Sequence, residues 1–353
     1  MSHARDAAGW PRWVALLKII KVPFCIFWIT PIIFGFIASA DDPSASRLFW
    51  LTAAVLGTFA LEGLNCLHNE LKDREEDAVN QPARRELLDS WSEATLWRTV
   101  IVGYAVCAVG LIWFAVFVSP WIPVLMLAGG VFAPLYNWGP RFKRRPVLAE
   151  LTMGWSLFMG YVQGFFLATA DGWDLGHSFS DLPVVIGVCV YIEIVTNFFK
   201  DLPDVRGDER VGAPGLFSVR GRWVRSALLL WITLSPYLLI GGLVGVDVLP
   251  ERFLLAGVTL PVAVLLAVLA ERADTEDTWI VTYELAFLYL HAVLVFLFVL
   301  DSPGAAAVAA GAALVTSRWL AIYLGLAPRF VNPEFSWGGA TRELWQKAWQ
   351  GAK

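Results

Sequence analysis

Long apolar runs separated by short polar breaks make up most of the chain. Nine of these runs are long enough to cross a lipid bilayer as α-helices, for which about 17–25 residues are needed. A tenth run is rich in Ala and Gly and contains Arg318, and the sequence leaves open whether it also spans. The pattern predicts an all-α fold, a polytopic membrane helical bundle. The nine runs lie at roughly 18–39, 48–69, 96–118, 120–138, 147–169, 182–200, 222–246, 252–271 and 278–300, and the tenth at about 304–325.

Composition supports an integral membrane protein. The chain has 353 residues, of which 57% are hydrophobic and 16% are charged, whereas soluble domains carry roughly 25% charged residues. No polar block is long enough to fold as a separate soluble domain. We therefore expect the lipid bilayer as a partner, and no nucleic acid.

Lys and Arg residues alternate between the loops. They are abundant in the loops after the second, fourth and sixth runs and absent from the loops after the third and fifth runs. Because cytoplasmic loops carry the excess of Lys and Arg, this alternation predicts a cytoplasmic N-terminus and three cytoplasmic basic loops. The basic residues after the second and fourth runs are Lys72, Arg74, Arg84, Arg85, Arg141, Lys143, Arg144 and Arg145.

Two rows of acidic and amide residues follow the ends of the second and sixth runs. Asn69, Asp73 and Asp77 recur every four residues, which places them on one face of a helix. Asp201, Asp204 and Asp208 have the spacing i, i+3, i+7, which is again one face if the helix continues. Charged groups at membrane depth are costly and usually functional. Both rows belong to the predicted cytoplasmic side, where they can meet.

These rows have the chemistry of a site for a metal diphosphate. Clustered carboxylate and amide oxygens suit Mg²⁺, which also keeps substrate phosphate oxygens in its shell. Neighbouring Lys and Arg residues are suited to a diphosphate. The alternative is that such residues are solvated groups at helix ends that pair with one another, and we assign that role to Glu70, Glu75, Glu76, Asp89 and Arg145.

The two rows resemble the motifs of the UbiA superfamily of intramembrane prenyltransferases. The first motif of that family is N-D-x-x-D-x-x-x-D, from which Asn69-Glu70-x-x-Asp73-x-x-x-Asp77 departs only at Glu70. The second, K-D-x-x-D-x-x-G-D, is unbroken from Lys200 to Asp208. The stretches 80–84 and 136–144 are similar to the N-x-P-x-R and Tyr/Pro/Lys-Arg segments of the family, whereas Asn197 stands where Asp or Tyr is more usual.

The resemblance implies nine helices around a central cavity with a lateral opening to lipid. It also implies a prenyl diphosphate donor held by Mg²⁺, and three segments: a cytoplasmic N-terminal segment (1–17), the transmembrane domain (18–300) and a C-terminal extension (301–353). The implied metal ligands are Asn69, Asp73, Asp77, Asp201, Asp204 and Asp208, with Asp73, Asp77, Asp201 and Asp204 as catalytic residues. The implied diphosphate contacts are Arg74, Arg84, Arg141, Lys143 and Lys200, and Asn65 and Tyr136 are expected to face the cavity.

Three functions are compatible with these features. The first is Mg²⁺-dependent transfer of a prenyl group to a lipophilic, aromatic or otherwise apolar acceptor at the cytoplasmic face, through loss of diphosphate and an allylic cation. The second is a terpene cyclase on the same scaffold, which needs no acceptor and leaves the motifs unchanged. The third is a transporter, which usually has a midplane site and internal repeats. Here the charges lie at one interface, so we predict a prenyltransferase, with the identity of the acceptor and the length of the prenyl chain left open.

Overall fold

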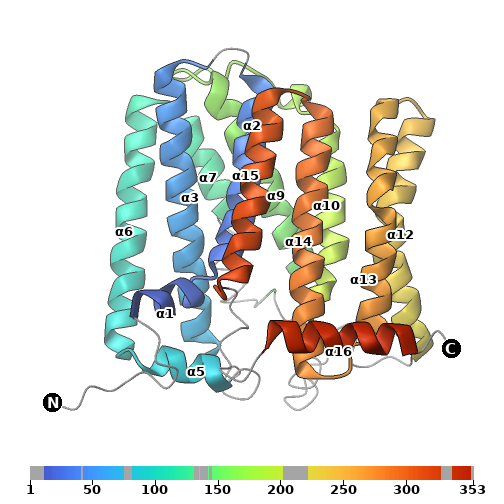
Figure 1. Cartoon of the computed structure of the whole chain (residues 1–353). Helices are drawn as coiled ribbons and strands as arrows, with labels where there is room; N and C mark the ends of the chain where they lie inside the picture. Colours follow the sequence, from blue (N-terminus) through green and yellow to red (C-terminus); the bar gives the residue numbers. More distant parts are fainter. Residues whose placement is uncertain are drawn as a thin grey trace.

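The computed structural model describes residues 12–40, 43–74, 82–130, 135, 142, 145–201, 222–326 and 336–350. Most of these residues belong to long helices that run side by side in one bundle (Figure 1). Short helices lie at the end drawn at the bottom, which is called the lower end below. Apart from an isolated bridge between Asp171 and Asp174, the described part contains no β-structure. The predicted all-α membrane bundle is therefore confirmed.

Each of the ten apolar runs contains a helix, and the tenth is among those long enough to span. Seven helices are long and apolar enough to cross a membrane within the described ranges, whereas α7, α9 and α10 are not among them. The number of nine spans therefore stays a prediction. The helices of the ten runs are α2 (Val22–Ser39), α3 (Ala45–Lys72), α6 (Glu93–Phe117), α7 (Trp121–Gly130), α9 (Pro146–Thr169), α10 (Val185–Thr196), α12 (Arg222–Gly245), α13 (Leu260–Arg272), α14 (Glu276–Asp301) and α15 (Ala305–Tyr323).

Six further elements complete the described chain. Three are 3₁₀-helices: η2 (Phe179–Asp181), η3 (Asn197–Asp201), which continues α10, and η4 (Glu251–Thr259), which leads into α13. The others are the helices α1 (Arg12–Ile19), α5 (Pro82–Asp89) and α16 (Trp337–Gln350). All three lie at the lower end, with α16 lying across the bundle (Figure 1).

Glycines let α2 and α9 approach each other more closely than side chains would allow. A Cβ atom added to Gly35 of α2 would lie 2.1 Å from the carbonyl oxygen of Tyr161, and one added to Gly164 of α9 would lie 1.9 Å from that of Ile32. Gly160 precedes Gly164 by one turn, which gives the small-xxx-small spacing typical of close helix pairs in membranes. The two backbones therefore touch, and α2 and α9 behave as one rigid unit.

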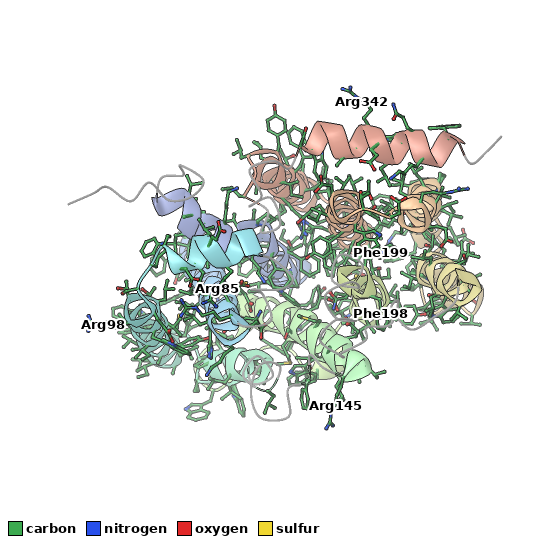
Figure 2. The ribbon with its side chains drawn as sticks, turned by 90° about the horizontal axis from the view of Figure 1, so that it is seen from below. Arg85, Arg98, Arg145, Phe198, Phe199 and Arg342 are labelled. Atoms are coloured by element: carbon green, nitrogen blue, oxygen red, sulfur yellow. The ribbon has the colours of Figure 1, made fainter. Side chains whose placement is uncertain are left out.

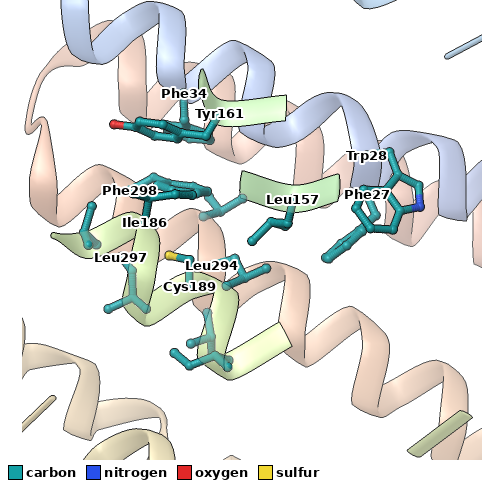
Figure 3. Close-up of a cluster of buried hydrophobic side chains, with 14 of the residues drawn as sticks. Phe27, Trp28, Phe34, Leu157, Tyr161, Ile186, Cys189, Leu294, Leu297 and Phe298 are labelled. Atoms are coloured by element: carbon teal, nitrogen blue, oxygen red, sulfur yellow. The ribbon is translucent and has the colours of Figure 1, made fainter. Parts of the chain in front are cut away.

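Stacked aromatic rings join this pair to α14. The ring of Phe298 lies 5.1 Å from that of Phe34 and 5.4 Å from that of Tyr161, between ring centres, and both pairs are stacked (Figure 3). All three side chains are almost completely buried. Aromatic pairs of this kind add about 0.5–1.5 kcal/mol to the stabilisation from burial alone. The centre of the bundle is thus built from α2, α9 and α14.

Helix α15 packs directly against α2 and α14. At Gly311 an added Cβ would lie 2.6 Å from Cγ1 of Val295, so the helices are in close contact there. Arg318 points inward with 2% of its surface exposed, and its guanidinium carbon lies 5.6 Å from the ring centre of Phe27 and 6.0 Å from that of Phe287. The division of the chain at residue 300 stays a prediction, and α15 is an integral part of the bundle.

Helix α16 lies against the lower ends of α13 and α14. Its apolar face buries Ala340 and Leu344 against a cluster that includes Leu266 and Trp279. Lys347 donates hydrogen bonds to Asp274, at 2.5 Å, and to Glu343, at 2.6 Å, on the polar side. Amphipathic packing therefore holds this helix at the end of the bundle that also carries the acidic rows.

Candidate functional site

The first acidic row lies where α3 ends. Helix geometry stacks Asn65 and Asn69 along one face of α3, and Asp73 is the C-cap residue, whose N–H donates to the carbonyl of Asn69 at 2.9 Å. The side-chain oxygen of Asn69 is buried and accepts no hydrogen bond from the described residues. Because a buried acceptor without a donor is costly, this oxygen is suited to a cation that is not part of the chain.

Asn65 is engaged by α6. The hydroxyl of Tyr104 donates to its side-chain oxygen at 2.8 Å, and Nδ1 of His68 lies 3.3 Å from the same hydroxyl. The expectation that Asn65 faces the central cavity stays a prediction. The bond to Tyr104 gives it a second role, because it fixes the rotation of α3 one turn before the acidic row.

Glu70, the position that departs from the family motif, is buried rather than solvated. Its side chain is 3% exposed, and one carboxylate oxygen lies 3.1 Å from Nζ of Lys21, at the start of α2. The sequence interpretation of Glu70 as a solvated, paired group at a helix end was therefore wrong about solvation, whereas the pairing with a cation is present. Lys21 has a left-handed backbone, with φ 56°, at the turn between α1 and α2. No local pattern links residues 21 and 70, so sequence reasoning missed this pair.

Arg74 pairs with carboxylates of the neighbouring helices. Its guanidinium donates to Glu93 at 2.5 Å and to Asp89, and Arg85 also donates to Asp89 at 2.5 Å. Although partial burial opposes it, these hydrogen bonds lower the pKa of Asp89. The predicted contact of Arg74 with a diphosphate stays a prediction. The ion pairs themselves hold α5 and α6 beside the end of α3, where Figure 2 shows Arg85.

The second acidic row begins where α10 tightens into η3. Glu193 lies in the last turn of α10, Asn197 is the first residue of η3, and Asp201 is its last residue. The side-chain amide of Asn197 donates to the carboxylate of Glu150, near the start of α9, and both residues are buried. No local pattern in the sequence links Glu150 to Asn197, because the two residues lie 47 positions apart.

Much of the predicted site lies outside the described residues. For the backbone-only positions Arg84, Lys200 and Asp201 the structure gives the course of the chain but no side-chain contacts. Among the described side chains, no group of three or more His, Cys, Asp or Glu residues is arranged to hold a metal ion. The predicted residues outside the described ranges are Asp77, Tyr136, Arg141, Lys143, Asp204 and Asp208, and their roles stay predictions.

The described parts of both rows lie at the lower end of the bundle. Helices α3 and α10 both finish there, beside α1, α5 and α16 (Figure 1). Figure 2 shows this end from below, with Phe198 and Phe199 in η3, which follows α10. An orphaned amide oxygen on Asn69 and a carboxylate on Asp73 are oxygen ligands, which Mg²⁺ prefers. The residues present therefore fit a hard divalent cation.

The fold and this site define a multi-pass, helical membrane protein with oxygen ligands at one end of its bundle. The model of the UbiA prenyltransferase family matches residues 28–291. The chain therefore belongs to the UbiA prenyltransferase family, an assignment that confirms the sequence resemblance. No protein of curated function matches the chain by sequence.

Solved structures share the fold at low sequence identity. A digeranylgeranylglyceryl phosphate synthase is 14% identical with a TM-score of 0.54, over 82% of this chain and 99% of that one. A UbiA homologue from Archaeoglobus fulgidus bound to DMAPP and Mg²⁺ is 14% identical with a TM-score of 0.54, over 79% and 98%. The same source gives a structure bound to GPP and Mg²⁺, which is 13% identical with a TM-score of 0.55, over 86% and 99%. At these identities the likeness establishes the fold alone.

Proposed function

We propose that this protein transfers a prenyl group from a prenyl diphosphate to a lipophilic acceptor, with Mg²⁺ as cofactor. The observation that carries the proposal is the buried side-chain oxygen of Asn69, beside Asp73, which accepts no hydrogen bond from the described residues. It lies at the same end of the bundle as the described part of the second acidic row (Figure 1). Similar structures bound to DMAPP and Mg²⁺ and to GPP and Mg²⁺ support the choice of donor and metal.

Asn69, Asp73 and Asp201 are the proposed metal ligands in the described part, and Asp77, Asp204 and Asp208 are proposed with them from the motif. When bound, Mg²⁺ neutralises the diphosphate as it leaves. The basic residues Lys143, Lys200 and Arg141 are proposed to hold the diphosphate oxygens by charge-assisted hydrogen bonds. The apolar helices behind the site exclude water, which would otherwise capture the allylic cation.

The site is proposed to face the cytoplasm. Helices α3 and α10, which precede the basic loops after the second and sixth runs, finish at the lower end (Figure 1). The positive-inside rule assigns loops rich in Lys and Arg to the cytoplasmic side. The N-terminus is assigned to the same side. Cysteine labelling from outside sealed cells tests this orientation: Asp247→Cys, in the loop after α12, should react with an impermeant reagent, and Ser336→Cys, just before α16, should not.

Turnover of labelled prenyl diphosphates tests the proposed activity. The purified protein in lipid nanodiscs is given donors of several chain lengths with Mg²⁺, with and without a panel of aromatic and lipid acceptors. We expect a prenylated acceptor in the presence of Mg²⁺ and no product in excess EDTA. Asp73→Asn should lower kcat by at least about 10²-fold. The substitution removes a charged ligand from the Mg²⁺, and the Mg²⁺ then stabilises the negative charge of the leaving diphosphate less well.

Asp247→Asn is the matched control. Asp247 has a positive φ of 58°, a conformation that Asn also tolerates, and it lies in the loop after α12, so its turnover should equal that of the wild type. If a cyclic hydrocarbon forms in the absence of acceptor, the activity is cyclisation of the prenyl chain rather than transfer. Turnover that survives both EDTA and Asp73→Asn would contradict the metal site.

A further inference from the structure

Two buried carboxylates connect the acidic rows to the rigid pair of helices α2 and α9. Glu70, inside the first row, lies 3.1 Å from Lys21 at the start of α2. Glu150, near the start of α9, accepts a hydrogen bond from Asn197, which precedes the second row. Both carboxylates are almost completely buried, with exposures of 3% for Glu70 and 1% for Glu150. Each row is therefore tied to a different member of the same helix pair.

The second contact lies at a change of helix type. The α-helical part of α10 ends at Thr196, and the chain continues as the 3₁₀-helix η3, Asn197–Asp201. A 3₁₀-helix has about 3.0 residues per turn instead of 3.6. The backbone path through residues 200 and 201 therefore depends on where the tightening begins. Asn197, the first residue of η3, is the residue held by Glu150.

The partner that holds Asn197 cannot shift easily. Glu150 lies in the second turn of α9, which begins at Pro146. Helix α9 is itself locked against α2, because Gly164 leaves no room for a Cβ beside the carbonyl oxygen of Ile32, 1.9 Å away. A carboxylate that accepts from an amide in a buried place forms a strong, directional bond. The position of Asn197 is therefore set by the frame of α2 and α9.

The first row is held in a similar way. Lys21 comes directly before α2, so its ammonium group moves with that helix, and it holds Glu70 between Asn69 and Asp73. A metal clamped between two rows needs a fixed separation between them, because Mg²⁺ demands near-ideal octahedral geometry. Outer groups that orient the ligands typically change metal affinity about 10–100-fold when they are removed.

We propose that Glu150 is a positioning residue, which holds the 3₁₀ turn of Lys200 and Asp201 through Asn197 while Lys21 holds the first row through Glu70. The α2–α9 pair is thereby the frame that sets the distance between the two halves of the metal diphosphate site. This inference rests on the proposed function, since it assigns the frame to that same site. It adds two residues, Glu150 and Lys21, that act through Asn197 and Glu70.

Metal binding measured apart from turnover tests this frame. Binding of Mn²⁺ in the presence of inorganic diphosphate is followed by electron paramagnetic resonance on the full-length protein in nanodiscs. Glu150→Leu removes the acceptor but keeps a side chain of similar size, and should weaken Mn²⁺ binding about tenfold or more. Glu150→Gln retains an oxygen that accepts from Asn197, and should restore binding to within about threefold of the wild type.

Two further variants make the result decisive. Lys21→Met breaks the contact to the first row and should weaken Mn²⁺ binding to a similar extent, which tests the frame even if Glu150→Leu does not fold. Arg252→Met removes the hydrogen bond from the Arg252 side chain to the carbonyl oxygen of Leu300, at 2.6 Å. This contact joins η4 to the end of α14, at the end of the bundle opposite the described parts of both rows (Figure 1). Its loss should leave Mn²⁺ binding unchanged.

Several outcomes would overturn the frame. Equal Mn²⁺ affinity for Glu150→Leu, Lys21→Met and the wild type would do so. An equal loss of affinity for Arg252→Met would also do so, because a general packing defect would then explain the result. A failure of Glu150→Gln to restore binding would also refute the role of the hydrogen bond. Wild-type protein that turns over no prenyl diphosphate, yet binds Mn²⁺ as described here, would instead contradict the proposed function and leave the frame intact.

Discussion

The close crossing of α2 and α9 makes a quantitative prediction for Gly164→Ala. The new Cβ would lie 1.9 Å from the carbonyl oxygen of Ile32 and 2.7 Å from its carbonyl carbon. Carbon–oxygen contacts in proteins are about 3.3 Å or longer, so the two helices must separate by about 1.4 Å. Neither contact partner is a flexible side chain, and the backbone itself has to move.

The expected cost follows from this displacement. Inserting an extra methyl group into a well-packed core costs about 1–3 kcal/mol, and sometimes more. The higher end is expected here, because the obstructing atoms belong to backbone and cannot rotate away. At roughly 2 °C per kcal/mol for a chain of this size, the unfolding temperature should fall by about 5 °C or more. The separated helices should also weaken Mn²⁺ binding, since Lys21 and Glu150 would move apart.

Gly110→Ala is the matched control. Gly110 lies in α6, and no heavy atom lies within 4 Å of the place its Cβ would take. Ala is preferred over Gly inside helices by about 1 kcal/mol, so this variant should be as stable as the wild type or slightly more stable. Thermal unfolding of both variants in nanodiscs measures the difference. Unfolding temperatures that agree within about 1 °C would refute the close crossing.

Three further predictions concern other parts of the molecule. Burial lowers the pKa of Lys18 to about 8, so the charged form is penalised only in the folded state. As the pH rises from 8 to 10, the free energy of unfolding of the wild type should therefore increase by up to about 2 kcal/mol relative to that of Lys18→Met. Thermal unfolding with the same pH dependence in both proteins would refute this. Leu344→Asp should detach α16, since Leu344 is 1% exposed, and accelerate hydrogen exchange over residues 337–350, whereas the exposed Arg342→Asp should not. Removal of Mg²⁺ with EDTA should stop prenyl turnover, and added Mn²⁺ should restore it; turnover that continues in excess chelator counts against the metal site.

Residue spacing located the acidic rows but did not assign partners to their side chains. The four-residue spacing of the first row predicted a helix at Asn69, and α3, which ends at Lys72, carries Asn69 and Asn65 one turn apart. It could not reveal that Tyr104 of α6 bonds to Asn65, because the rotation of α6 relative to α3 depends on how the two helices pack. For the same reason, Glu70 was interpreted as solvated although it is buried beside Lys21.

The sequence by itself determined which segments are helical, because a backbone in lipid must satisfy its hydrogen bonds within each helix. It also determined the family, through the motifs around Asn69 and Lys200. Only the tertiary structure decided that Gly35 and Gly164 bring α2 and α9 into backbone contact, that α15 inserts Arg318 beside Phe27, and that Glu150 meets Asn197. These contacts join residues far apart in the chain, and their formation depends on helix packing that no local pattern encodes.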